Sequence, residues 1–93
     1  MGEVEVRLPS LLARLLNGNS IVCVEAETLS GALLQLVRQH PELRVHLFEE
    51  NGELRRHVLC FHNDENTRWL TDFNRPIRVG DVITIMQAVS GGV

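Results

Sequence analysis

The segment VGDVITIMQAVSGGV, residues 79–93, decides the fold because it joins a strand pattern directly to a glycine-rich C-terminus. Gly80-Asp81 is typical of a tight turn. The β-branched run that follows predicts a strand with Ile83 and Ile85 on one side. After this strand the chain reads SGGV, with a single valine beyond the paired glycines. The rest of the sequence predicts the kind of folded domain that precedes this ending.

Length and composition predict one globular domain. The 93 residues are enough for a single core. With 44% hydrophobic and 23% charged residues, the chain has the balance of a folded protein and not of a disordered one. A net charge of −3 gives no electrostatic argument for nucleic acid or an anionic membrane. No apolar run approaches the roughly 20 residues of a spanning helix. The acidic, alternating start MGEVEVRL is unlike a secretory signal, so we expect a cytoplasmic protein.

The first half of the chain predicts a β-hairpin followed by a helix. Residues 3–8 alternate strictly between polar and apolar types, and a second strand is expected near residues 20–25. The LLARLL segment between them is compatible with a helical turn or a packed loop. Thr28 is expected to cap a helix that runs to about Gln39 and stops before a proline. The side chains expected in the core are Val4, Val6, Leu8, Val22, Val24, Leu29, Leu33, Leu36 and Val37.

The second half predicts three further strands. The sequence LRRHVLCFH (residues 54–62) predicts the third strand, and TRWL (67–70) a small edge strand after a turn at NDEN (63–66). The order is therefore β-β-α-β-β-β. This order favours an α+β β-grasp fold: a mixed sheet of four to five strands, the first and last parallel at its centre, with one main helix packed on one face. We expect a domain over residues 1–89 and a flexible tail over 90–93.

Cysteine and histidine spacing gives no sign of catalysis or metal binding. Cys23 and Cys60 lie in apolar runs and are expected to be two buried thiols, although the sequence leaves a disulfide open. The histidines lack the i, i+4 spacing of a helical zinc site, so they are expected to be solvated. No Ser-His-Asp or Cys-His arrangement can be assembled, and we expect no catalytic residue. The four histidines are His40, His46, His57 and His62.

Alternation along the last strands predicts an apolar patch on the open face of the sheet. Leu59, Phe61 and Met86 would point outward and could dock a partner enzyme. The neighbouring side chains would then face the core, namely Val58, Cys60 and Ile85.

The C-terminal segment, together with RRHVLCFHNDENTRW (residues 55–69), resembles the small sulfur-carrier branch of the ubiquitin-like proteins, the MoaD/ThiS type. That branch includes the small subunit of molybdopterin synthase, the thiamine-pathway carrier and the cysteine-biosynthesis carrier. A strand, Asn-Asp-Glu and a short strand resemble the cysteine-pathway carrier more than the molybdopterin one. The glycine tail with its Gly-Asp turn is the specific part of this resemblance, while the remainder is common to β-grasp domains.

The resemblance implies chemistry at the C-terminus. In this family an E1-like enzyme adenylates the terminal glycine carboxylate with ATP, and a sulfide source then converts it to a thiocarboxylate. The resemblance therefore implies Gly92 as the activated residue, with Ser90 and Gly91 as a slender tail and no cofactor bound to the carrier. Val93 departs from the pattern, which implies cleavage between Gly92 and Val93 by a zinc-dependent JAMM-type peptidase. If Val93 is foreign to the natural protein, the function is the same without this step.

The acceptor pathway is implied only by the resemblance. The expected acceptor is a pyridoxal-phosphate-dependent cysteine synthase. The alternatives are the small subunit of molybdopterin synthase or another thiocarboxylate pathway, a ubiquitin-like protein modifier, and a β-grasp interaction module that is never activated. All nine basic residues are arginine, so the chain has no lysine amine to which a second copy could be joined.

Overall fold

The computed structural model describes residues 2–69 and 73–87. The main elements follow the predicted order, with three short 3₁₀ helices (η) among the connections. The strands are β1 (Gly2–Arg7), β2 (Ile21–Ala26), β3 (Val58–His62), β4 (Glu65–Asn66) and β5 (Val82–Gln87). The helices are α1 (Ser10–Ala13), η1 (Arg14–Leu16), α2 (Leu29–Gln39), η2 (Pro41–Leu43), α3 (Arg44–Leu47) and η3 (Thr67–Trp69).

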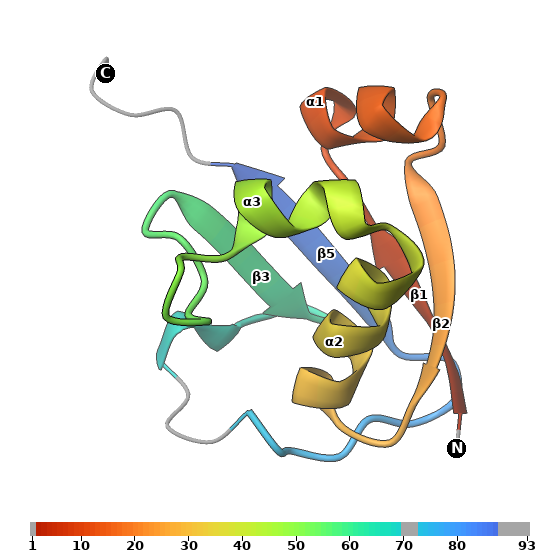
Figure 1. The fold of residues 1–93 in the computed structure, drawn as a ribbon. Coiled ribbons are helices and arrows are strands. Elements are labelled where there is room, and N and C mark those ends of the chain that lie inside the picture. The colour runs from red at the N-terminus through yellow and green to blue at the C-terminus, as the bar shows by residue number, and fades with distance from the viewer. Residues whose placement is uncertain (1, 70–72, 88–93) are drawn as a thin grey trace.

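The five strands form one mixed sheet in the order β2-β1-β5-β3-β4. β1 and β5 lie in parallel at its centre, with Val6 opposite Ile83, and the other neighbours are antiparallel. α2 lies across one face of this sheet, with α3 beside it (Figure 1). The predicted α+β β-grasp architecture is therefore confirmed, with five strands.

The core lies between α2 and the sheet. The predicted inward-facing residues are all buried except Val37, which is partly buried at the edge of the core. Thr28 caps α2 as predicted, because its hydroxyl accepts a hydrogen bond from the Gly31 N–H at 3.1 Å. The helix ends at Gln39, and Pro41 begins η2. Burying this apolar surface, at about 25 cal/mol per Å², is the main force that holds helix and sheet together.

Two predicted elements differ from the structure. The short edge strand is Glu65–Asn66, whereas Thr67–Trp69 forms a 3₁₀ helix and not the predicted strand. The reason is Thr67, which is 1% exposed and donates its hydroxyl to the Cys60 carbonyl at 2.8 Å, so the chain turns inward at the sheet edge. The third strand also begins only at Val58, after a turn.

LLARLL is helical in the structure, as α1 followed by η1. Of the two predicted possibilities, a helical turn or a packed loop, the helical turn is therefore the one observed. Within residues 2–69 and 73–87, no helix is long and apolar enough to cross a membrane. The predicted domain boundary at residues 89–90 lies outside the described residues.

Candidate functional site

The candidate site is the C-terminal end of β5 and the sheet surface beside it. The tail residues implied in activation and cleavage lie outside the described residues, namely Ser90, Gly91, Gly92 and Val93. What the structure places is the strand that leads to them. At its last three residues β5 is paired with β3, and Gln87 lies opposite Val58. The point at which the chain leaves the sheet is therefore set by this ladder.

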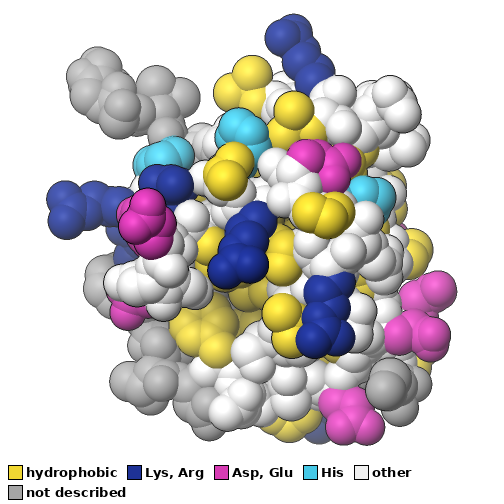
Figure 2. Space-filling view, in the orientation of Figure 1, with side chains coloured by type: hydrophobic (Ala, Val, Ile, Leu, Met, Phe, Trp, Pro, Cys, Tyr) yellow, Lys and Arg dark blue, Asp and Glu magenta, His cyan; other side chains and the backbone are white. Residues whose placement is uncertain are grey.

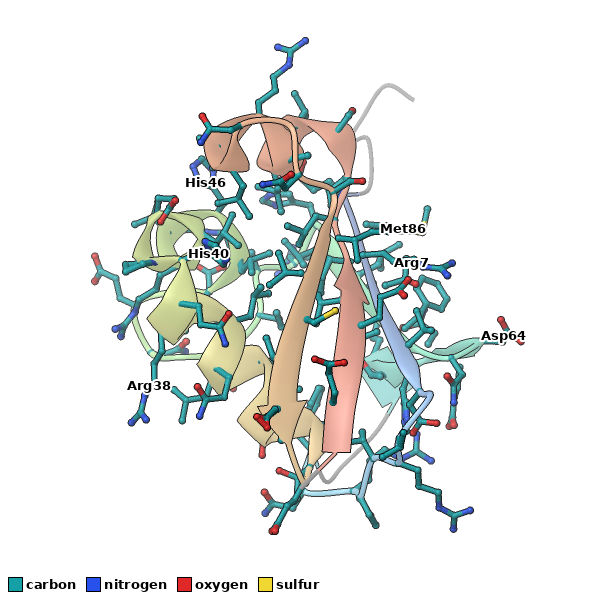
Figure 3. The ribbon with its side chains drawn as sticks, turned by 90° about the vertical axis from the view of Figure 1, so that its right-hand side faces the viewer. Arg7, Arg38, His40, His46, Asp64 and Met86 are labelled. Atoms are coloured by element: carbon teal, nitrogen blue, oxygen red, sulfur yellow. The ribbon has the colours of Figure 1, made fainter. Side chains whose placement is uncertain are left out.

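The three predicted patch residues lie together on the open face. Met86 is 48% exposed and lies directly opposite Leu59, while Phe61 lies opposite Thr84 on the same face. Leu59 and Phe61 are half-buried. Figure 3 shows Met86 on the side of the sheet away from the helices. The neighbouring side chains Val58, Cys60 and Ile85 are buried, so the predicted inward and outward faces are confirmed. That the patch docks a partner stays a prediction.

The structure places a further exposed apolar residue, Ile21, on the same face of the sheet. Ile21 is 54% exposed and lies opposite Arg7, which in turn lies opposite Thr84 on β5. The alternation of β2 already pointed to it, because Val22 and Val24 face the core and Ile21 must then face outward. Arg7 and Thr84 lie between Ile21 and Phe61 in this cross-strand row, so Ile21 is separate from the patch.

The other half of the open face is acidic and carries a thiol. Glu3 lies opposite Glu25, and Glu5 lies opposite Cys23. Cys23 is exposed, so the prediction of two buried thiols is wrong for this residue. Its position between Val22 and Val24 explains the difference, because neighbours on a strand point to opposite faces.

Cys60 is buried as predicted and has a different chemistry from Cys23. Burial raises the pKa of the Cys60 thiol to about 11, although a hydrogen bond with Thr67 opposes this shift. Both thiols are free. At neutral pH the Cys60 thiol is therefore protonated and a poor nucleophile.

A polar network fixes the start of β5. His62 was expected to be solvated, but its Nε2 lies 2.8 Å from Oδ2 of Asp81, and the two side chains are only 10% and 18% exposed. Asp81 also accepts from the Arg78 N–H at 2.9 Å and from the Asn63 amide at 3.3 Å. The Val82 N–H donates to Asn63 Oδ1 at 2.9 Å. This network joins the turn after β3 to the turn before β5.

The hydrogen bond from His62 is the main reason that the pKa of Asp81 is lowered to about 2. Sequence reasoning identified the Gly-Asp turn but missed the partner, which lies 19 positions away. The other histidines are exposed or half-buried. Within residues 2–69 and 73–87, no three His, Cys, Asp or Glu side chains are grouped so that they could hold a metal ion.

Comparison with known proteins gives one consistent group of relatives. A family model described as the ThiS family matches residues 6–92, which includes the Gly-Gly pair and stops before the last residue. The sulfur carrier protein CysO of Mycobacterium tuberculosis is 30% identical over 92 residues, which cover 97% of this chain and 99% of that protein.

Two solved structures have the same fold and similar sequences. SAMP1 from Haloferax volcanii superimposes with a TM-score of 0.82 and 31% identity, over 98% of this chain and 100% of that one. The Amycolatopsis orientalis BexX/CysO complex contains a chain with a TM-score of 0.82 and 27% identity, over 96% of this chain and 99% of that one.

Proposed function

The chain belongs to the ThiS family, and from this premise we propose that it is a sulfur carrier activated at Gly92. The observation that carries the proposal is the extent of the similarity. Identity of 30% to a sulfur carrier protein spans 97% of the chain, and the family match includes both tail glycines. The central strand β5 supports it, since it leads directly to that tail.

The proposed chemistry takes place at the tail in three steps. Hydrolysis of the Gly92–Val93 peptide bond adds one water and releases free valine, leaving a Gly92 carboxylate. That carboxylate attacks the α-phosphorus of ATP and displaces pyrophosphate. A sulfide equivalent then attacks the acyl carbon and displaces AMP, which leaves a thiocarboxylate. Glycine suits this end because it has no Cβ, so the tail can enter a narrow channel in a partner.

We assign catalysis in each step to partner enzymes. A JAMM-type zinc peptidase would remove Val93, an E1-like enzyme would use ATP and a sulfide source, and a pyridoxal-phosphate-dependent cysteine synthase would accept the sulfur. The open-face patch of Leu59, Phe61 and Met86 is the proposed docking surface for the activating enzyme. Its position on the strands next to the tail favours this role, because docking there would hold the tail near the partner's active site.

Protein modification is the second candidate function. The observation that favours it is the 31% identity to SAMP1, a small archaeal modifier protein. In that case the activated Gly92 carbonyl would be attacked by an amine of another protein, with loss of AMP. The chain contains no lysine, so it would form single conjugates and no lysine-linked chains of itself.

Intact mass spectrometry of the protein from the cells that make it tests both functions. Loss of one valyl residue and exchange of one oxygen for sulfur are the expected result, and conjugates that disappear when Gly92 is deleted would instead favour modification. In vitro, a chain ending at Gly92 should be adenylated by ATP and the activating enzyme, whereas the matched chain ending at Val93 should not. Two unchanged chains would overturn the sulfur-carrier proposal and leave an interaction module.

A further inference from the structure

A groove opens on the helical side of the sheet, and Leu59 is the one patch residue that also lines it. It lies between α2, α3 and the start of β3 and has a volume of about 910 Å³. Among the described residues, four hydrophobic side chains are partly buried and pack against the core. All four line this groove. They are Val37, Phe48, Leu54 and Phe73. Figure 2 looks onto this hollow and shows hydrophobic side chains within it. The core is thus open to solvent here and offers an apolar floor.

Arginines surround this floor. Among the described residues, four arginines line the groove, namely Arg44, Arg55, Arg56 and Arg68, against two carboxylates. One carboxylate is engaged, because Glu49 pairs with Arg55 at 3.2 Å. Among the described residues, neither Arg44 nor Arg56 has an ion-pair partner. The groove is therefore a positive region on a chain whose net charge is −3.

Hydrogen bonds to the backbone hold part of this rim in place. The Arg68 guanidinium donates to the Arg56 carbonyl at 2.7 Å, and Nε of Arg55 donates to the Val45 carbonyl at 2.7 Å. The arginines come from three places in the fold: α3, the turn before β3, and η3. They are thus spread around the opening.

We propose that this groove binds an acidic peptide segment of a partner protein. An apolar side chain of that segment would pack on the floor near Phe48 and Phe73, and its carboxylates would face Arg44, Arg56 and Arg68. Charges distributed around an open apolar floor suit a segment with several carboxylates better than a small anion, which needs polar groups that converge on one point. A membrane surface is disfavoured because the apolar side chains lie in a hollow and the whole chain is negative.

The proposal is independent of the sulfur-carrier function. Of the three patch residues only Leu59 also lines the groove, whereas Phe61 and Met86 do not, so the chain could hold one partner in the groove while another engages the tail. The ligand used to test the proposal is a synthetic peptide of sequence EDFEDLE, blocked at both ends. Controls are EDGEDGE, which lacks the apolar side chains, KKFKKLK, which reverses the charge, and dodecanoate, a small apolar anion.

The test is a titration of the full-length, ¹⁵N-labelled protein followed by amide chemical shifts. EDFEDLE should shift the amides that line the groove, whereas none of the controls should bind comparably. The double variant R44E/R56E should weaken binding at least about tenfold, because charge reversal at an interface places like charges together. The matched control R14E/R38E reverses two exposed arginines outside the groove and should change the affinity less than about threefold. Circular dichroism and the dispersion of amide signals would establish that both variants fold.

Several outcomes would overturn the proposal. If R44E/R56E and R14E/R38E lost the same amount of peptide affinity, the binding would be nonspecific charge attraction and not recognition by the groove. Binding of dodecanoate without binding of EDFEDLE would make the groove a small-molecule site. Absence of groove shifts at millimolar peptide would exclude an acidic partner segment. A dimer in sedimentation experiments without peptide, with the groove buried between subunits, would assign the groove to a second copy of the chain.

Discussion

The two ends of β5 are held in different ways. At the start of the strand, Asp81 accepts hydrogen bonds from His62 and Asn63 as well as from the backbone. At its other end, Gln87 lies opposite Val58, and its buried side-chain oxygen has no hydrogen-bond partner among the described residues. Side-chain hydrogen bonds therefore fix the strand far from the tail, whereas the end that leads to the tail relies on the backbone ladder and apolar packing.

Under the proposed docking role of the patch, this difference separates stability from partner binding along a single strand. The network at the start fixes the position and direction of β5 through side chains that lie at the opposite end of the strand from Met86 and Gln87. The exposed side chain nearest the tail, Met86, is then available to a partner. We expect changes at the start to lower stability and changes at the end to affect partner binding.

Asp81→Ala should have the largest effect on stability. It removes the acceptor of His62 and of the Arg78 N–H and should lower the free energy of unfolding by about 2 kcal/mol. Urea denaturation measures this change. The matched control is Asp64→Ala, an exposed acidic residue two positions after His62, which should cost less than about 0.5 kcal/mol. Equal losses in the two variants would mean that the network does not anchor the strand.

The contribution of Asp81 should depend on pH. Its pKa is about 2 in the folded chain against an ordinary value of 3.8, so the folded state favours the ionised carboxylate. The stability that it adds is therefore fully present above about pH 4 and is lost as the pH falls through about 2. The difference in unfolding free energy between the wild type and Asp81→Asn should shrink as the pH falls from about 4 towards 2. A difference that widens between pH 4 and 2 would contradict the lowered pKa of Asp81.

Met86→Glu tests the end of the strand that faces the tail. Met86 is half-exposed, so the unfolding free energy should change by less than about 0.5 kcal/mol. Because the added charge lies in the proposed docking patch, adenylation of a chain ending at Gly92 should slow about tenfold. Release of pyrophosphate with the activating enzyme measures the rate. Val79→Glu adds the same charge at a 79% exposed position near the N-terminus of β1 and should leave the rate unchanged. Similar rates in the two variants would remove the docking role from the patch.

Gly80→Ala should destabilise the turn before β5. Gly80 has a φ of +93°, and an added Cβ would meet no atom within 4 Å, so the cost comes from the backbone alone. We expect about 1 kcal/mol in urea denaturation. Gly80→Asn should cost less, because asparagine adopts left-handed conformations more readily than alanine. Equal stability of all three chains would show that the turn accepts another conformation.

Gln87→Leu should have the smallest effect and the opposite sign. The change replaces a buried oxygen that lacks a described partner with an apolar group of similar size, which should be neutral or stabilise by up to about 1 kcal/mol. Gln39→Leu, at an exposed position at the end of α2, is the control for added hydrophobicity. A clear loss of stability in Gln87→Leu would mean that this amide has a partner after all.

Local sequence patterns predicted most of the fold. Alternation identified the inward faces of β1, β2, β3 and β5. Thr28 predicted the start of α2, and Pro41 predicted its end. The patch was predicted for the same reason, since a strand with one buried face fixes the opposite face. Cys23 was mispredicted because the apolar run was given more weight than the alternation. The edge strand was misplaced because the inward turn at Thr67 depends on a carbonyl seven residues away.

The sequence by itself determined the elements, their inward faces and the glycine-rich ending of the last strand. Periodicity and turn residues report directly on which side chains can face a core, so they can be interpreted without long-range contacts. Only the tertiary structure paired His62 with Asp81, placed Ile21 in line with Phe61 and gathered four arginines around one groove. These arrangements join positions that are far apart in the chain. Their geometry depends on how the strands and helices pack, which no local pattern encodes.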